Sequence, residues 1–113
     1  MRRGEIYFVD FDPIIGREQS GRRPALVLSI DVINSRPLVV TVVPGTDGAN
    51  VRGDYPGTVR LAPTETGLPV ETVFLCFQVR AIDHSRFPTR PAGHMSAGGM
   101  RQVNQSVRYC LGL

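Results

Sequence analysis

The densest group of chemically useful side chains lies in one long connection, residues 12–24 (DPIIGREQSGRRP). Around two glycines and between two prolines it carries Arg17, Glu18, Gln19, Ser20, Arg22 and Arg23. A guanidinium group presents a rigid fork of donors that matches a phosphate, and a carboxylate can accept a proton. A hairpin turn needs only about two to five residues, and longer connections in compact domains tend to be functional or disordered. We therefore expect a functional loop here.

A second long connection, residues 44–57 (PGTDGANVRGDYPG), contains four glycines and starts at the predicted end of an apolar strand. Strand ends and long loops are where a rigid scaffold presents binding and catalytic groups. We expect this loop to be mobile and to help select a ligand, together with the basic last third of the chain.

The elements that must position these loops are mostly strands. Segments rich in β-branched and aromatic residues predict strands at residues 5–11, 24–30, 38–43, 57–62 and 72–80. A sixth short strand is expected around residues 92–95, and residues 64–69 are expected to form a turn.

The C-terminal segment changes to a helical period, because apolar residues recur at Met100, Val103, Val107 and Leu111. Ser96 is a suitable N-cap, but Gly98 and Gly99 follow it, and each glycine costs about 1 kcal/mol relative to alanine within a helix. We expect the first turn to fray and the ordered helix to begin near Met100. The sum is a small antiparallel barrel-like sheet with one terminal helix packed on it.

Composition places the chain among ordinary globular domains. Its 113 residues are 42% hydrophobic and 20% charged, which fits a single domain over residues 1–113. No apolar run has the length of a membrane span or a signal peptide, so we expect a cytoplasmic protein without a membrane partner. Cys76 and Cys110 lie in apolar stretches without metal-ligand spacing, and we expect two buried thiols, neither a zinc site nor a disulfide.

Charge is unevenly distributed. The formal net charge is +3, and every basic residue other than histidine is an arginine. Residues 80–113 carry five arginines and one acidic residue, giving five minus one, or +4. A basic patch suits a polyanionic partner, and a solvated charged face is the alternative.

Several segments resemble the MazF/PemK-type toxins of bacterial toxin–antitoxin systems. Residues 3–10 (RGEIYFVD) resemble the opening strand of that family, and residues 16–24 (GREQSGRRP) resemble its G-x-E-Q-x-G-x-R-P loop. Residues 42–46 (VVPGT) resemble a strand ending in Pro-x-Thr, residues 77–83 (FQVRAID) resemble its D-Q-I-R-T-I-D segment, and the final helix ends in a similar Leu-Gly-Leu. The resemblance covers essentially the whole chain in order.

The resemblance implies a small SH3-like or CcdB-like antiparallel β-barrel of about five to seven strands that forms a homodimer. It also implies an endoribonuclease that cuts single-stranded RNA, most naturally mRNA, at short sequences without a metal or other cofactor, and so arrests growth. A cognate antitoxin with an acidic binding segment would silence it.

The same resemblance assigns residues. Arg23 and Thr46 match the principal catalytic pair of the family, and Glu18 matches its loop glutamate. Gln19 and Gln78 match family positions near the RNA.

Four further residues are candidates for RNA contact. These are Arg17, Arg22, Asp47 and Arg80.

The chemistry can be argued from the reaction itself. Without a metal, the neighbouring 2′-hydroxyl is the nucleophile, which leaves a 2′,3′-cyclic phosphate and a 5′-hydroxyl end. The protein has to help remove a proton, stabilise the charge of the transition state and assist the leaving oxygen. Arg23 suits the charge, Thr46 can donate a hydrogen bond to the same phosphate, and Glu18 is a candidate base.

Structural alternatives stay open for these residues. Arg23 could form a salt bridge with Glu18 or Asp31, Thr46 could be a turn cap, and Glu18 could orient Arg23 instead of acting as a base.

Two positions depart from the family pattern. Phe77 replaces an aspartate and is expected to fill the core, although an exposed ring could stack on a base. Asp47 replaces a serine or threonine and adds negative charge near the expected scissile phosphate. His84 and His94 have suitable pKa values for a two-histidine mechanism but lie on polar segments outside the motifs, so we do not assign them.

Two other functions would use the same scaffold. One is a non-enzymatic toxin that binds DNA gyrase, and the other is an inactive RNA-binding module.

Overall fold

The computed structural model describes residues 1–12, 15–16, 21–36 and 38–113. Three predicted site residues, Arg17, Glu18 and Gln19, lie outside these ranges.

The described residues form an antiparallel sheet with short helices at its margins and one long helix. The strands are β1 (Glu5–Asp10), β2 (Arg22–Val27), β3 (Val39–Asp47), β4 (Thr58–Leu61), β5 (Thr72–Leu75), β6 (Arg80–Asp83) and β7 (Gly93–His94). The α-helices are α1 (Asp31–Asn34), α2 (Pro63–Thr66) and α3 (Ala97–Leu111), and 3-10 turns are η1 (Gly48–Asn50), η2 (Cys76–Gln78) and η3 (His84–Arg86).

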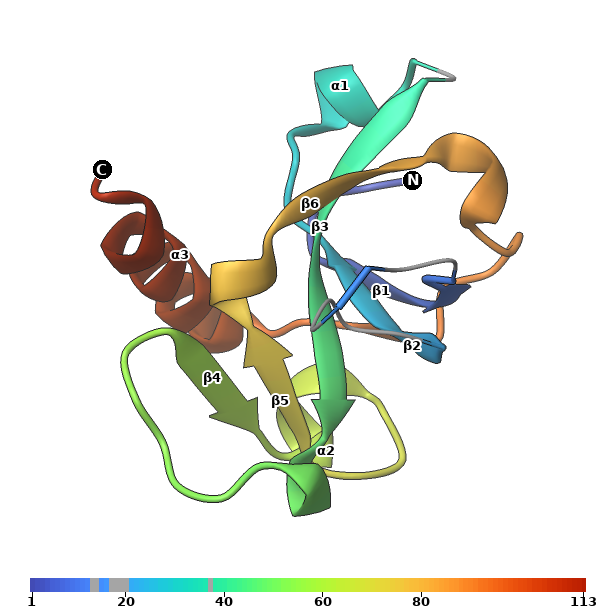
Figure 1. Cartoon of the computed structure of the whole chain (residues 1–113). Coiled ribbons are helices and arrows are strands. Elements are labelled where there is room, and N and C mark those ends of the chain that lie inside the picture. The colour runs from blue at the N-terminus through green and yellow to red at the C-terminus, as the bar shows by residue number, and fades with distance from the viewer. Residues whose placement is uncertain (13–14, 17–20, 37) are drawn as a thin grey trace.

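Strand β3 belongs to both halves of the sheet. The strands follow the order β4-β5-β3-β2-β1-β7, and β6 pairs with β3 from outside this path. Residues 39–42 of β3 pair with β6, whereas residues 45–47 pair with β5. Figure 1 shows β3 running through the middle of the molecule as the sheet curls around it. The prediction of a mainly β, barrel-like antiparallel fold with a C-terminal helix is therefore confirmed.

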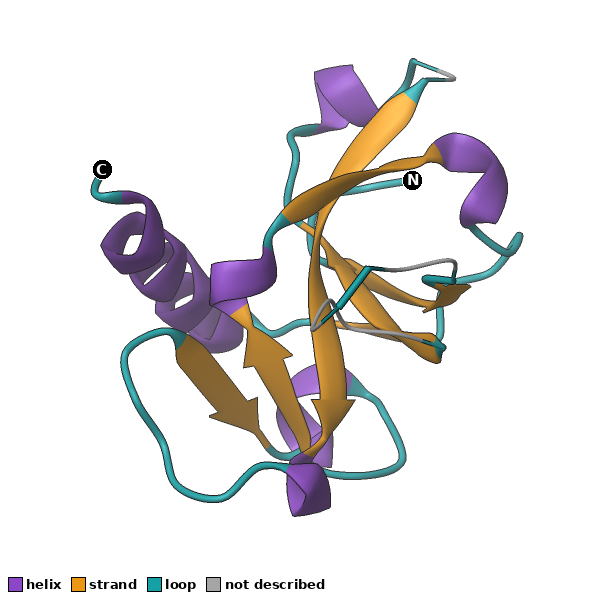
Figure 2. Ribbon diagram, viewed as in Figure 1, coloured by secondary structure: helices purple, strands orange, loops and turns teal. Residues whose placement is uncertain are grey.

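Each face of the sheet has its own core. One cluster includes Ile6, Leu26, Val43 and Phe74 and is covered by Val103 of α3. Figure 2 shows this helix packed to one side of the strands. The second cluster lies on the opposite face and contains Tyr7, Val9, Phe11, Ala25, Val27, Val40, Val42 and Ile82. The alternation of side chains along β2 separates the two clusters.

The prediction of one strand over residues 72–80 is wrong. The chain leaves β5 after Leu75, makes the turn η2 and re-enters the sheet as β6 on the other half of β3. A continuous apolar run does not distinguish one long strand from two short ones, because both are buried. The expected turn at residues 64–69 is also partly helical, since α2 occupies residues 63–66. The single-turn helix α1 was not predicted.

The second long loop is shorter than expected. Strand β3 continues through Pro44, Gly45 and Thr46 to Asp47, so the first four residues of the expected loop are strand. A Cβ atom at Gly45 would lie 3.0–3.2 Å from side chains of Thr72, Pro24 and Phe74. The glycine therefore allows three strands to approach closely where β3 passes from one half of the sheet to the other.

Helix α3 begins at Ala97, three residues before the expected start, and its first turn is capped. The Ser96 hydroxyl accepts a hydrogen bond from the Gly99 amide at 2.9 Å. Gly99 is buried against Met95 and Leu61, where a side chain would not fit without rearrangement. Close packing thus offsets the low helix propensity of the glycine.

The cysteines and the membrane prediction can be compared with the structure. Cys76 is buried, as expected, and burial raises the pKa of its thiol to about 11. Cys110 is only partly buried, contrary to the expectation, because it lies near the exposed end of α3. Both are free thiols. Within the described ranges, we find no helix with the length and apolar character that a membrane crossing requires.

Candidate active site

The two predicted catalytic residues lie on neighbouring strands. Strands β2 and β3 pair in antiparallel register as far as Ala25 and Pro44. Continuing that register by two residues places Arg23 opposite Thr46. Directly opposite residues of antiparallel strands project from the same face, with Cβ atoms about 4.5–5.5 Å apart. On this continued register, the side chains of Arg23 and Thr46 belong to one face of the sheet.

Contacts beside this pair support the continued register. Pro24 and Gly45 are the next opposite residues, and a Cβ atom at Gly45 would lie 3.1 Å from Cγ of Pro24. Thr46 is 5% exposed, and Arg23 is half-buried. The strands thus remain in contact up to the predicted pair.

Arg80 lies on the same face of the sheet. It pairs with Val42, two residues from Pro44 and four from Thr46, so alternation gives these side chains a common face. Its guanidinium carbon lies 5.4 Å from the centroid of the buried Phe11 ring. Nη1 of Arg80 is buried and makes no hydrogen bond to any described residue. A buried cationic donor without such a partner is suited to an anionic ligand.

Gln78 ends the turn η2, half-buried and two residues before Arg80. The turn lies beside the middle of β3, between residues 45–47, which pair with β5, and residues 39–42, which pair with β6.

Arg22 lies on the other face. It is exposed, pairs with Asp10, and its guanidinium carbon lies 5.8 Å from the centroid of the Phe8 ring. Arg22 and Arg23 reach a common pocket of about 170 Å³ at the sheet margin. That pocket is lined by Phe8, Arg22, Arg23, Pro24, Asp47, Leu68, Pro69, Val70 and Thr72.

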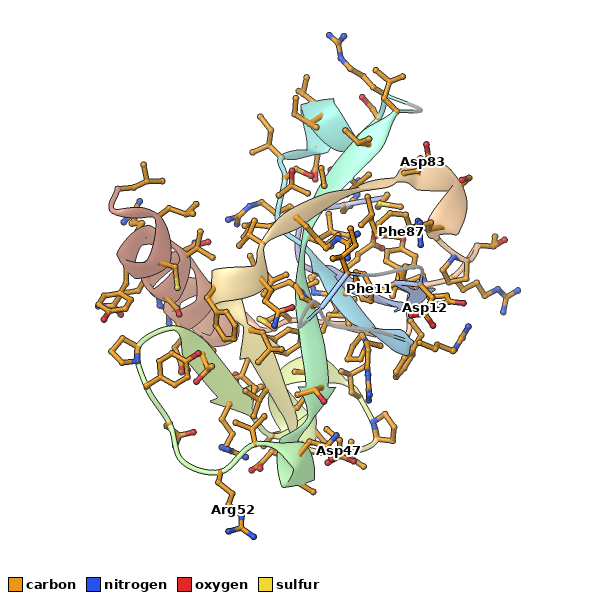
Figure 3. All side chains as sticks on the ribbon, viewed as in Figure 1. Phe11, Asp12, Asp47, Arg52, Asp83 and Phe87 are labelled. Carbon is orange, nitrogen blue, oxygen red and sulfur yellow. The ribbon has the colours of Figure 1, made fainter. Side chains whose placement is uncertain are left out.

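Asp47 stands at the end of β3, on the rim of this pocket. Its carboxylate accepts a hydrogen bond from the Ala49 amide at 2.9 Å and so caps the turn η1. Figure 3 shows Asp47 next to the end of β3, and Arg52 farther along the loop pointing away from the fold. Asp47 is therefore both a structural cap and an accessible carboxylate at the pocket.

The Thr46 hydroxyl accepts a hydrogen bond from Nδ2 of Asn50 at 3.2 Å. The turn η1 that carries Asn50 is held by Arg60 of β4. Nη1 of Arg60 donates to the Gly48 carbonyl at 3.0 Å, and Nη2 donates to the Val51 carbonyl at 2.7 Å. Sequence reasoning missed Asn50 and Arg60, because neither position carries a motif and only the folded loop brings them to Thr46.

Two acidic residues complete the environment of Arg60. Its guanidinium forms ion pairs with Asp54 at 2.9 Å and Glu71 at 2.8 Å. Hydrogen bonds to Asp54 and then to Glu71 raise the pKa of Arg60. Bonds to Arg60 therefore hold this loop from Gly48 to Asp54.

The base of the first loop is closed by backbone and side-chain bonds. The Phe11 amide donates to the Gly21 carbonyl at 2.9 Å, and the Gly21 amide donates to Oδ1 of Asp12 at 3.1 Å. Nη1 of Arg86, in η3, donates to the carbonyls of Asp10 at 3.0 Å and Asp12 at 2.7 Å. Arg86 was not predicted, since the contact joins segments far apart in sequence.

Phe77 does not fill the core as expected. It is 50% exposed, and its ring centroid lies 6.0 Å from that of Tyr55. The turn η2 directs it outward, because the chain there is leaving one strand for another. His84 and His94 are also exposed, and His94 lies in the short strand β7.

Metal ligation was not predicted for these residues. Within residues 1–12, 15–16, 21–36 and 38–113, no three His, Cys, Asp or Glu side chains are grouped so that they could hold a metal ion.

Comparison with known proteins identifies the family. Residues 2–111 match the family described as PemK-like, MazF-like toxin of type II toxin-antitoxin system. The chain belongs to this toxin family. The endoribonuclease MazF9 of Mycobacterium tuberculosis is 40% identical over 118 residues, an alignment that covers 100% of this chain and 98% of that protein.

Solved structures of MazF agree with the fold. The crystal structure of MazF from Deinococcus radiodurans superposes with a TM-score of 0.83 at 28% identity, covering 100% of this chain and 97% of that one. The MazE–MazF structure from the same organism gives a TM-score of 0.77 at 28% identity, covering 100% and 96%. The resemblance seen in the loop and strand motifs is thus confirmed as family membership.

Proposed function

We propose that this chain is the toxin of a type II toxin–antitoxin system and acts as an endoribonuclease on single-stranded RNA. The relative with 40% identity over the whole chain is named an endoribonuclease, and this chain has that family's fold. The observation that supports the mechanism is the antiparallel register of β2 and β3, which ends at Ala25 and Pro44 and, when continued by two residues, sets Arg23 opposite Thr46.

The proposed reaction is an attack by the 2′-hydroxyl on the adjacent phosphate without a metal. The O2′–P bond forms, the P–O5′ bond breaks, and the products are a 2′,3′-cyclic phosphate and a 5′-hydroxyl end. The guanidinium of Arg23 stabilises the negative charge that grows on the non-bridging oxygens, and the Thr46 hydroxyl donates a hydrogen bond to the same group. Glu18, assigned from the sequence alone, accepts the 2′-hydroxyl proton or orients Arg23.

RNA is proposed to follow the face that carries Arg23 and Arg80. The partly buried guanidinium of Arg80 suits a second phosphate, and the half-buried Gln78 can contact a base edge. The pocket beside Arg22 and Asp47 suits a flanking base, because its lining combines apolar side chains with a cation and a carboxylate. Arg17 and Gln19 are sequence-based members of the same set.

We propose that residues 1–113 act as one toxin domain that forms a homodimer in the cytoplasm. Large apolar side chains are exposed on and beside α1 and at the start of β3, namely Ile30, Val32, Ile33, Leu38 and Val39. Contiguous exposed apolar surface of this kind marks association sites. A MazE–MazF structure exists for a relative, and here a cognate antitoxin with an acidic segment would cover the basic RNA face.

The endoribonuclease activity is tested by incubating the purified protein with RNA in the presence of EDTA. Fragments with 2′,3′-cyclic phosphate and 5′-hydroxyl ends are expected, and sequencing their 5′ ends gives the cut site. Gyrase inhibition with intact RNA would instead identify a non-enzymatic toxin, and RNA binding without cleavage would identify an inactive module.

Neighbouring arginines provide a matched pair of variants. Arg23→Ala should lower the cleavage rate about 100-fold or more, since losing one transition-state donor typically costs about 10²–10³ in rate. Arg22→Ala, on the opposite face, should weaken RNA binding and change the rate far less. Equal losses in the two variants would contradict the assignment of Arg23 to the reacting phosphate.

A further inference from the structure

The hydroxyl of Thr46 is held by the side chain of a residue outside every recognised motif. Nδ2 of Asn50 donates to Oγ1 of Thr46 at 3.2 Å. A threonine hydroxyl has one proton to donate and two lone pairs that accept. Because Asn50 uses a lone pair, the proton of Thr46 must point elsewhere, and within the described part of the chain no acceptor takes it. The bond therefore leaves the hydroxyl ready to donate to a ligand.

We propose that Asn50 is a positioning residue that sets the Thr46 hydroxyl as a donor to the scissile phosphate, and that Arg60 secures the turn that carries it. The proposal rests on the proposed function, in which Thr46 contacts that phosphate. Asn50 itself touches neither the phosphate nor the reacting atoms, and no proton is transferred through it.

The turn that presents Asn50 is fixed on both sides. On one side, the Gly48 amide donates to the Glu71 carbonyl at 2.8 Å, and Asp47 caps the turn at the Ala49 amide. A Cβ atom at Gly48 would lie 2.6 Å from Oε1 of Glu71, so a side chain there would displace the carboxylate that binds Arg60. On the other side, the Val51 amide donates to the Gly48 carbonyl at 3.2 Å.

Arg60 holds the carbonyl groups of the same turn. All three nitrogens of its guanidinium donate hydrogen bonds. Nε donates to the carboxylate of Asp54, and Nη1 donates to the carboxylate of Glu71 and to the Gly48 carbonyl. Nη2 donates to the carbonyls of Val51 and Gly53. This many bonds to one rigid fork leave Asn50 little freedom relative to Thr46. The loop is thus ordered where it supports the hydroxyl, and its exposed tip at Arg52 is available for RNA selection.

The test is a double-mutant cycle measured under single-turnover conditions on an RNA oligonucleotide that carries the sequenced cut site. Asn50→Ala removes the donor, and the rate constant at saturating enzyme should fall about threefold to tenfold, the range that one neutral hydrogen bond represents. The half-saturating enzyme concentration should stay unchanged. In a Thr46→Val background, Asn50→Ala should have no further effect on the rate constant. Asn104→Ala removes an amide of the same kind on α3 and serves as the control with wild-type rate.

A second variant reverses the direction of the hydrogen bond. In Asn50→Asp the new carboxylate accepts the Thr46 proton and diverts it from the phosphate, so the loss should exceed that of Asn50→Ala at neutral pH. The loss relative to wild type should shrink as the pH falls and the carboxylate is protonated, because a protonated carboxyl can donate again.

The outcomes separate this inference from the function on which it rests. A wild-type rate for Asn50→Ala, or equal losses in the Thr46 and Thr46→Val backgrounds, would overturn the positioning role while the endoribonuclease assignment stands. A wild-type rate for Thr46→Val would overturn both the catalytic role of Thr46 and the inference. Absence of RNA cleavage by the unmodified protein would overturn the proposed function itself.

Discussion

The two glycines at the start of α3 should respond to alanine in opposite directions. A Cβ atom at Gly99 would lie 2.8 Å from Cγ of Met95 and 3.1 Å from Cδ1 of Leu61, both in the core under the helix. A Cβ atom at Gly98 would come no closer than 3.7 Å to Arg101, which is ordinary van der Waals contact. The two positions differ in packing far more than in helix propensity.

The magnitudes follow from this difference. Replacing glycine by alanine in a helix gains at most about 1 kcal/mol, and Gly98→Ala should retain most of that gain. Gly99→Ala receives the same gain but overpacks the core, which typically costs about 1–3 kcal/mol. Because the propensity gain cancels in the comparison, Gly99→Ala should be less stable than Gly98→Ala by about 1–3 kcal/mol.

Urea unfolding at one fixed protomer concentration measures the difference, since a dimer would make the midpoint depend on concentration. With a slope of about 1–3 kcal/mol per molar urea, the two midpoints should differ by on the order of 1 M. Coincident midpoints would refute the claim that Gly99 is retained for close packing, and would revive the expectation that the first helical turn frays.

Other predictions test the remaining features. Native protein at pH 8 should be alkylated at Cys110 before Cys76, because Cys76 is buried with a pKa raised to about 11; equal labelling would contradict that burial. The hydrogen bond to Ser85 is the main cause that lowers the pKa of Asp83, so the contribution of Asp83 to stability is present above about pH 3.8 and is lost as the pH falls through the lowered pKa. An Asp83→Asn variant should lose this pH dependence. Urea midpoints that stay unchanged from pH 7 to pH 3 in both proteins would contradict the stabilising role of Asp83. Arg60→Ala should open the loop to limited proteolysis, and an unchanged digestion pattern would show that the guanidinium does not hold it. Exchange of residues 47–56 for the corresponding loop of a related toxin should change the sequenced cut site, whereas an unchanged site would place selection elsewhere.

Local sequence patterns predicted several of the strands and the C-terminal helix. Strand β1 appears close to its expected position, because β-branched and aromatic residues favour a strand. The short strand near residue 93 also appears, although Gly93 and His94 are not strand-favouring residues. The break after Leu75 could not be predicted from local sequence, because it depends on tertiary pairing: β5 pairs with residues 45–47 of β3, and β6 pairs with residues 39–42. The start of α3 was predicted wrongly for a related reason. The helix propensity of Gly99 is a local property, but its close packing against Leu61 joins segments far apart in sequence.

Some residues of the candidate site could be predicted from the sequence, and others could not. The Arg-Pro pair and the Pro-x-Thr strand end were visible as motifs, and the continued register between Ala25 and Pro44 sets Arg23 opposite Thr46. Asn50 and Arg60 gave no sequence signal, because the amide in the turn η1 and the guanidinium on β4 acquire their roles only from the hydroxyl and carbonyl groups that folding brings to them.

The position of β3 in both halves of the sheet bears on how such a protein can be switched off. Thr46 pairs with Val73 of β5, and the strand that carries it also pairs with β2 and β6, so deforming β3 as a whole would disrupt most of the cooperative unit. Regions of that kind open with nearly the full free energy of unfolding. An inhibitor therefore gains more by shielding the reactive surface than by deforming it, and full activity should return as soon as the shield is degraded.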